Sequence, residues 1–193
     1  MNTDIPPLTG ELLGLDLINT RARSGTDSID HLSTPDGLRM WVALQGERLK
    51  EFGGDVLATV SQADLSAIRS VRECASQLVD HVRHGKAPSD ASLRELNRTL
   101  SAAPVHLELR WVGSSMAAEA RRTGSVIADL AAHLAEAVAL VLTDPGVSTI
   151  RKCEAEDCTM LFLPASSRRR WCAAARCGNR MRVARYYQRH KDS

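Results

Sequence analysis

IRKCEAEDCTMLFLPASSRRRWCAAARCGNR, residues 150–180, holds four of the five cysteines of this 193-residue chain. They form two pairs, each with four residues inside it, and thirteen residues separate the pairs: Cys153, Cys158, Cys172 and Cys177. Two close pairs joined by a loop supply the four thiolates that tetrahedral zinc requires. The pattern predicts one Zn²⁺ ion held by these four residues, and a site filled entirely by protein is structural and not catalytic.

The segment around these cysteines has few apolar side chains from which to build a core. A segment of this size rarely folds without a disulfide or a metal, and zinc binding supplies roughly 10–16 kcal/mol of folding free energy. Two disulfides or four free buried cysteines are the alternatives. We expect a cytoplasmic protein, in which disulfides are rare. The fifth cysteine, Cys74, is expected to be a small buried residue of a helix.

Charge is unevenly distributed along the chain. Residues 151–193 contain 11 Lys/Arg and 4 Asp/Glu, a net charge of +7, whereas residues 1–150 contain 14 and 19, a net charge of −5. Such asymmetry is typical of a nucleic-acid-binding end attached to another unit, although two oppositely charged halves could also dock on each other.

A basic helix is predicted over residues 178–190, preceded by an arginine triplet. Arg182, Arg185 and Arg189 share one face of this helix, which suits contacts with phosphates and with guanine. We expect Met181, Val183, Ala184 and Tyr187 to pack on the zinc segment. Asn179 could cap the turn or reach a base edge. The candidate DNA-contacting residues are Arg168, Arg169, Arg170, Arg176, Asn179, Arg180, Arg182, Arg185 and Arg189. A solvated face, or a protein or acidic-lipid partner, are the alternatives, and an arginine face does not distinguish DNA from RNA.

The first 147 residues show mainly helical patterns. Apolar spacing and caps predict helices over residues 12–18 (with a strand possible), 35–45, 65–84, 90–100 and 126–141. Residues 105–111 alternate strictly, which predicts a half-buried strand with no identified partner, and residues 27–33 are expected to be a polar connection. No apolar run is long enough to span a membrane. We place the domain boundary between residues 143 and 150.

Asp16 and Asn19 stand out as polar residues in the apolar stretch 12–18 and its continuation. Either they bond to backbone or to an arginine such as Arg21 or Arg23, or they line a small-molecule pocket. His133 is expected to be an ordinary half-buried histidine. Asp16, Asn19 and His133 are the only candidates for an enzyme site, and nothing in their spacing joins them. We therefore predict that the protein is not an enzyme.

The C-terminal residues resemble a known family. Trp171-Cys172 followed by Cys177-Gly178-Asn179-Arg180 resembles the signature of CGNR zinc fingers, and Phe162 is placed as that family places it. Leu15-Asp16-Leu17-Ile18-Asn19-Thr20, with Trp41 and Gly46, is similar to the ABATE domain that accompanies this finger. Pro164 departs from the family, which has an acidic residue at that place.

The resemblance implies a bacterial stress-related transcription regulator with the same four cysteines as zinc ligands. The expected fold is mainly α: a helical domain with a small β element over residues 1–147, and a treble-clef-like zinc finger ending in a basic helix over residues 148–193. The expected partners are double-stranded DNA, a small-molecule effector and a second copy, with no membrane. A protein-interaction adaptor with a structural zinc site, or an enzyme with its site near Asp16, are the other hypotheses.

Overall fold

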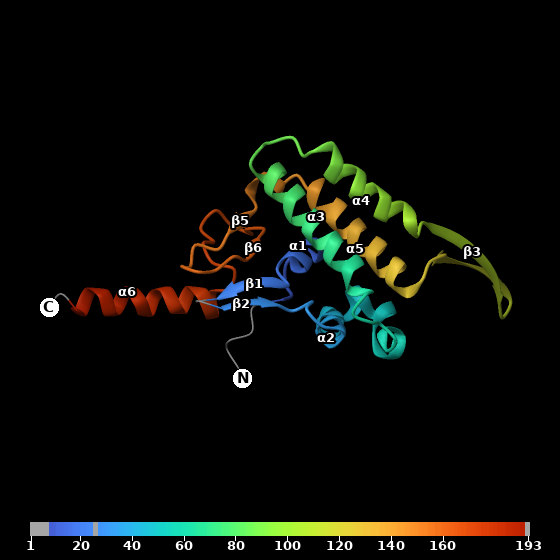
Figure 1. Cartoon of the computed structure of the whole chain (residues 1–193), viewed down its shortest axis with the longest axis horizontal. Helices are drawn as coiled ribbons and strands as arrows, with labels where there is room; N and C mark the ends of the chain where they lie inside the picture. Colours follow the sequence, from blue (N-terminus) through green and yellow to red (C-terminus); the bar gives the residue numbers. More distant parts are fainter. Residues whose placement is uncertain (1–7, 25–26, 192–193) are drawn as a thin grey trace.

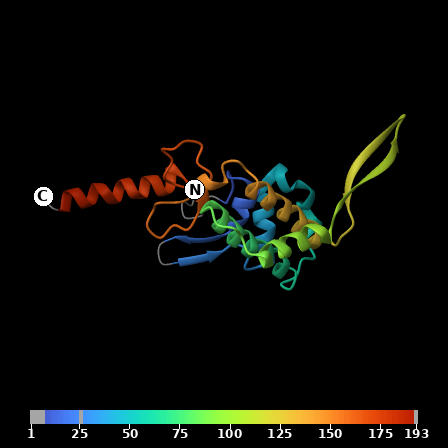
Figure 2. The same ribbon diagram turned by 90° about the horizontal axis from the view of Figure 1, so that it is seen from above.

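The molecule is elongated, with a helical body and one projecting element at each end (Figure 1). A computed structural model describes residues 8–24 and 27–191. Helix α6 (Asn179–Lys191) projects from one end, and the hairpin of β3 (Val105–Val112) and β4 (Ser115–Arg122) projects from the other. The view from above shows the same two projections (Figure 2).

The body is built on three long helices, α3 (Leu65–Arg83), α4 (Asp90–Ala102) and α5 (Val126–Leu142), which pack on one another. Helix α1 (Leu13–Ile18) lies against α5, and a Cβ atom at Gly14 would come within 2.8 Å of the carbonyl oxygen of Ala137. This close approach requires glycine. Within the described residues, no helix has both the length and the apolarity to cross a membrane.

Helix α2 begins and ends at residues that the sequence predicts. The Oγ1 atom of Thr34 accepts a hydrogen bond from the Gly37 amide at the start of α2 (Pro35–Gln45). The helix ends at Gly46, whose φ of 57° suits glycine. Leu38, Trp41 and Val42 are buried as expected, but Leu44 is half exposed, because it points away from the core.

Short elements complete the fold. They are β1 (Arg21–Ser24), β2 (Asp27–Asp30), β5 (Arg151–Lys152), β6 (Leu161–Phe162), the 3-10 helices η1 (Gly46–Phe52), η2 (Gly54–Leu57) and η3 (Val147–Thr149), and the π-helical turn η4 (Ala174–Gly178). Strands β1 and β2 pair antiparallel, as do β5 and β6. The prediction of a plain polar connection over residues 27–33 is therefore wrong at its start, because residues 27–30 find a partner in β1.

The prediction for residues 105–111 is half right. They form β3, and the partner that the sequence did not identify is β4, which pairs antiparallel with it (Leu109 opposite Ala118). The strand is not half-buried: every residue of β3 is exposed. Beyond its base the hairpin extends past the helices, so no other described element covers either face of that part (Figure 2).

Candidate metal centre and nucleic-acid interface

The four predicted zinc ligands converge at one point. The Sγ atoms of Cys158 and Cys172 lie 3.9 Å apart, those of Cys172 and Cys177 lie 3.6 Å apart, and all four sulfurs lie within 4.8 Å of one another. Sulfurs bound tetrahedrally at about 2.3 Å from zinc stand about 3.8 Å apart. A disulfide needs about 2 Å, so the cysteines are free thiols and the geometry and donor chemistry fit one structural zinc ion.

Two pieces of chain present the sulfurs. Cys153 follows β5 and its amide donates to the carbonyl of Met160, while Cys158 precedes β6 after a turn at Asp157, where φ is 63°. Cys172 and Cys177 lie on the loop before η4 and within it. The Cys172 amide also donates to the sulfur of Cys153, at 3.4 Å, which ties the two pieces together.

Crowding of the sulfurs separates their pKa values. Hydrogen bonds from Cys158, Cys172 and Cys177 hold the pKa of Cys153 far below its usual value. Cys153 raises the pKa of Cys158, but bonds from the other two cysteines outweigh it and bring the pKa to about 7. The pKa values of Cys172 and Cys177 are raised. A thiolate at one position thus opposes ionisation of its neighbours, and a central cation allows all four to ionise.

The cysteines form the centre of a second small core, separate from that of the helical body. Its members are Ala22, Cys153, Ala155, Cys158, Met160, Phe162, Cys172 and Cys177, with Trp171, Ala173 and Met181 at its edge. Ala22 belongs to β1 of the helical domain. Residues 160–163 alternate: Met160 and Phe162 face this core, whereas Leu161 and Leu163 pack on the main core. The finger is therefore seated on the helical domain by one strand with two apolar faces.

Polar contacts reinforce this seat. The Asn19 side chain donates to the carbonyl oxygen of Leu161 at 2.9 Å and accepts from its amide at 2.8 Å, as a neighbouring strand would. Glu11 accepts from the Leu163 amide at 3.0 Å and pairs with Arg169 at 2.5 Å. Sequence reasoning selected Asn19 but missed Glu11, because an acidic residue near the start of an apolar stretch carries no distinctive signal.

Asp16 is fully buried and bonded on both oxygens. It accepts from the Glu11 amide at 3.2 Å and forms an ion pair with Arg48 at 2.6 Å. The partner is not Arg21 or Arg23, because η1 brings Arg48 to α1. Burial raises the pKa of Asp16 to about 6, against the lowering effect of Arg48. The ligand-pocket interpretation of Asp16 and Asn19 stays a prediction.

Gly178 is explained by close packing. A Cβ atom there would lie 3.1 Å from the indole Cδ1 of Trp171, so glycine lets this ring pack beside a ligand-bearing turn. Asn179, the next residue, donates to the carbonyl oxygen of Ala175 and accepts from Arg182. Its side chain thus bonds within the turn between η4 and α6.

The candidate arginines divide into two groups. Arg169 donates to Glu11 and lies 4.4 Å from the Phe162 ring centre, Arg170 pairs with Glu154, and Arg180 donates to the carbonyl oxygen of Glu156. These bonds support the finger. Arg176 is partly buried. The pKa of His31 is lowered mainly by burial of its own ring, and the charge of Arg176 lowers it further. Arg170 and Arg180 are exposed despite their bonds, and the remaining exposed candidate arginines are Arg168, Arg182, Arg185 and Arg189.

We call Arg182, Arg185 and Arg189 the arginine face. They lie on α6, whose described residues carry no acid. Together with Trp171 and Tyr186 they border a hollow of about 370 Å³. The Arg185 guanidinium lies 5.9 Å from the Trp171 ring centre. The arrangement places positive charge beside an aromatic ring on a helix that projects into solvent (Figure 1).

The expected packing of α6 on the zinc segment is largely wrong. Met181 does contact the cysteine core. Val183, Ala184 and Tyr187 are exposed, because α6 leaves the finger after its first turn. His133 is half-buried, with its Nδ1 atom 3.1 Å from Glu51.

Comparison with known families agrees with this architecture. A family model described as "ABATE: Putative stress-induced transcription regulator" matches residues 11–145, and one described as "CGNR zinc finger" matches residues 149–190. These findings confirm the resemblance drawn from the sequence. Neither description names an enzyme. No curated protein matches the chain.

Replacing one zinc ligand tests the metal centre. We expect the wild-type protein to carry one zinc ion per chain by elemental analysis and Cys172→Ser to lose it, because three thiolates bind zinc far more weakly than four. Cys74→Ser is the matched control: Cys74 is buried in α3, where its sulfur bonds to the Ser92 carbonyl, and that variant should keep its zinc. Full zinc retention by Cys172→Ser would contradict the assignment.

The buried Asp16 carboxyl predicts a specific pH dependence. Its folded pKa of about 6 exceeds the ordinary 3.8, so the folded state holds this proton more tightly than the unfolded state between these pH values. The free energy of unfolding of the wild type should fall relative to Asp16→Asn as pH rises from about 4 to above 6, by on the order of 2–3 kcal/mol.

Urea unfolding at several pH values measures this difference, in which contributions common to both proteins cancel. Asp55→Asn, at an exposed position of η2, is the control and should follow the wild type. Parallel curves for wild type and Asp16→Asn would show that the carboxyl titrates alike in both states.

Proposed function

The chain belongs to the ABATE family and ends in a CGNR zinc finger; on that premise we propose that it is a transcription regulator that binds double-stranded DNA. In this proposal residues 148–193 are the DNA-binding unit. Residues 1–147 sense a small molecule, form a homodimer, or do both, and the protein acts in the cytoplasm. No enzymatic activity is proposed.

The arginine face is the observation that carries the DNA-binding proposal. Its three guanidinium groups are exposed on one side of α6, and no acidic residue occurs between Asp157 and Asp192 to neutralise them. A projecting helix is about as wide as the major groove, and arginines bind phosphates and read guanine. The zinc core fixes the start of α6, so the helix is presented in a defined direction.

The other candidate residues have supporting roles in this proposal. Arg168 is exposed and is a second phosphate contact from the preceding loop. Arg169, Arg170 and Arg180 bond within the protein and hold the loop and the helix in place. Asn179 orients Arg182 through its side-chain oxygen, at 2.7 Å.

Sensing would occur where the two units meet. Asn19, Glu11, Arg169 and Cys172 border a cavity of about 240 Å³ between the helical domain and the finger. A small molecule there would touch both units at once. Asp16 would not contact the small molecule directly. It would act through Glu11, whose amide donates a hydrogen bond to the Asp16 carboxylate.

DNA binding is tested by titrating the zinc-loaded chain with a labelled random duplex at several salt concentrations. The affinity should fall steeply with salt. A plot of log affinity against log salt concentration should have a slope of about −0.9 for each phosphate that the protein neutralises. The double change Arg182→Ala with Arg185→Ala should reduce that slope by about 2 and weaken binding, because each arginine contacts one phosphate.

Arg94→Ala, which removes an exposed arginine from α4 in the body, is the control and should bind as the wild type does. Chelator-treated protein should lose binding. Equal affinity of the double variant and the wild type would refute the arginine face. The absence of binding at low salt would instead favour a protein-interaction adaptor.

A further inference from the structure

The projecting hairpin has one apolar face and one charged face. The apolar face consists of Val105, Leu107, Leu109 and Trp111 of β3 with Met116, Ala118 and Ala120 of β4. Alternation along both strands places these side chains on the same side. Leu107, Leu109 and Trp111 are 71%, 68% and 68% exposed. A hairpin alone has no core, so these residues gain nothing from folding unless something covers them.

The opposite face is satisfied by its own ion pairs. Arg121 pairs with Glu119 at 2.6 Å and with Glu108 at 3.5 Å, and Arg110 pairs with Glu119 at 3.5 Å. This face suits water. The apolar face, in contrast, is a contiguous apolar surface of a size that is uncommon in monomers, and such a surface marks an interaction site.

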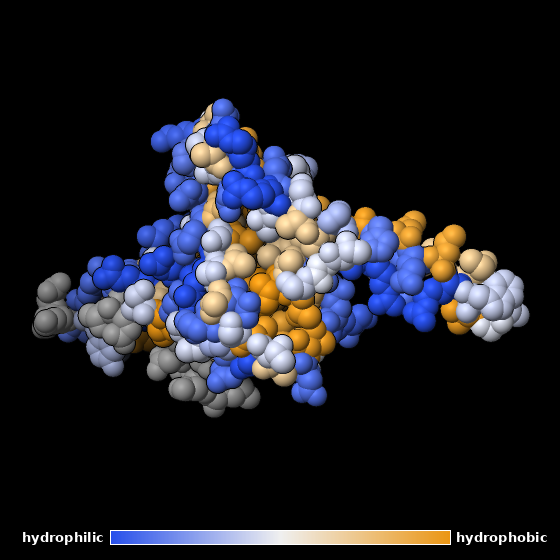
Figure 3. Space-filling view, turned by 45° about the vertical axis from the view of Figure 1, so that its right-hand side comes forward, coloured by the Kyte–Doolittle hydropathy of each residue, from blue (hydrophilic) through white to orange (hydrophobic). Residues whose placement is uncertain are grey.

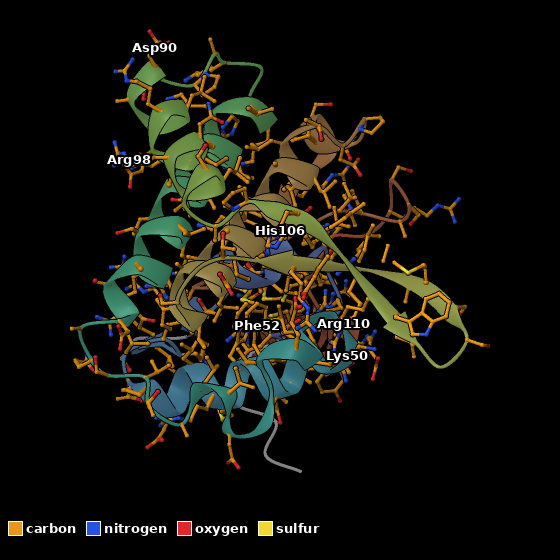
Figure 4. The ribbon with its side chains drawn as sticks, turned by 90° about the vertical axis from the view of Figure 1, so that its right-hand side faces the viewer. Lys50, Phe52, Asp90, Arg98, His106 and Arg110 are labelled. Atoms are coloured by element: carbon orange, nitrogen blue, oxygen red, sulfur yellow. The ribbon has the colours of Figure 1, made fainter. Side chains whose placement is uncertain are left out.

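The apolar face continues into a pocket at its base. The pocket has a volume of about 480 Å³, and Val105 and Ala120 of the hairpin line it together with Phe52, Val56 and Val126 of the body. Apolar side chains run along the hairpin and gather again on the body beside it (Figure 3). In the view from the hairpin end, Phe52 appears below His106, which lies near the base of the hairpin (Figure 4). The surface is thus a strip with a hollow at one end and Trp111 near the other.

The charged groups around this pocket are largely paired. Arg122 forms an ion pair with Glu136 at 2.5 Å, and His133 lies 3.1 Å from Glu51. Arg122, opposite Val105, is the one charged residue of the two strands on the apolar face, and Glu136 neutralises it. A strongly acidic or basic partner therefore has little to bind here, whereas an identical face meets no like charge.

We propose that the occupant of this surface is a second copy of the chain. A two-fold axis crossing the hairpins places the two apolar faces together in opposite directions, so each tip reaches the other copy's base. A strand of eight residues spans about 27 Å, which is the length of this overlap. Trp111 of each copy then enters the pocket of the other, and the same patch serves both sides, as closed two-fold symmetry requires.

The area is sufficient for a specific dimer. The large side chains of the face expose on the order of 100–200 Å² each, and with the pocket lining each copy offers close to the ~800 Å² per partner of a stable interface. Trp111 is the expected anchor, because an aromatic side chain filling a desolvated pocket contributes most to such interfaces.

This inference rests on the homodimer in the proposed function and is independent of DNA binding. The hairpin and α6 lie at opposite ends of the molecule (Figure 1). Dimerisation through the hairpins therefore leaves both arginine faces free, and a monomeric variant should keep single-site binding to DNA.

Sedimentation equilibrium of the zinc-loaded full chain tests the proposal. The wild type should be a dimer, and Leu109→Glu should weaken dimerisation roughly a hundredfold or more, because it buries an unpaired carboxylate in both copies. His106→Glu is the matched control: it adds the same charge to the same strand on the opposite face, across from Arg121, and should remain a dimer.

Trp111→Ala should also weaken the dimer, and tryptophan fluorescence of the wild type should shift to shorter wavelength as the concentration rises. Unchanged circular dichroism and zinc content show that the variants fold. A monomeric wild type overturns the proposal, even if the hairpin captures another protein. A dimer that Leu109→Glu leaves intact overturns this surface but not the homodimer. Failure of DNA binding with the dimer intact overturns only the DNA-binding proposal.

Discussion

Four sulfur atoms within one coordination sphere are the constraint on which the C-terminal part of the structure depends. Few large apolar residues surround them, so the cysteines themselves form the centre of the second core. Their thiolates repel one another. A zinc ion neutralises this repulsion, and its binding free energy is the main source of folding free energy for this segment. The start of α6 is attached to this centre by η4, which contains Cys177, and by Met181, and Arg180 adds a hydrogen bond to the carbonyl oxygen of Glu156. The direction of the arginine face is therefore a consequence of metal binding.

The finger is not an independent unit hung on a linker. Residues 160–163 have two apolar faces, one for each core, and Asn19 completes the edge of β6 with both of its amide atoms. Ala22 of β1 reaches into the cysteine core. The helical domain and the finger thus share a boundary in which apolar packing and paired hydrogen bonds coincide.

Local signals made much of this predictable, and tertiary placement made the rest unpredictable. The cysteine spacing predicted the metal centre, and caps such as Thr34 predicted the helices, because both depend on residues near in sequence. Alternation over residues 105–111 predicted a strand but not its exposure, since exposure depends on what packs against it. The burial expected for Val183 and Tyr187 failed because α6 leaves the body. Asn19 was recognised as unusual, yet its partner Leu161 lies 142 residues away and no local pattern could identify it.

We expect zinc to organise the finger and its contact with the helical domain as one structure. Hydrogen–deuterium exchange over the whole chain, with zinc bound and with zinc removed, measures this dependence. Removal of zinc should increase exchange of the finger backbone and also of α1 and β1, where Asn19 and Ala22 contact it, while α4 stays protected. A change confined to residues after 150, or no change at all, would show that zinc does not organise the contact between the finger and the helical domain.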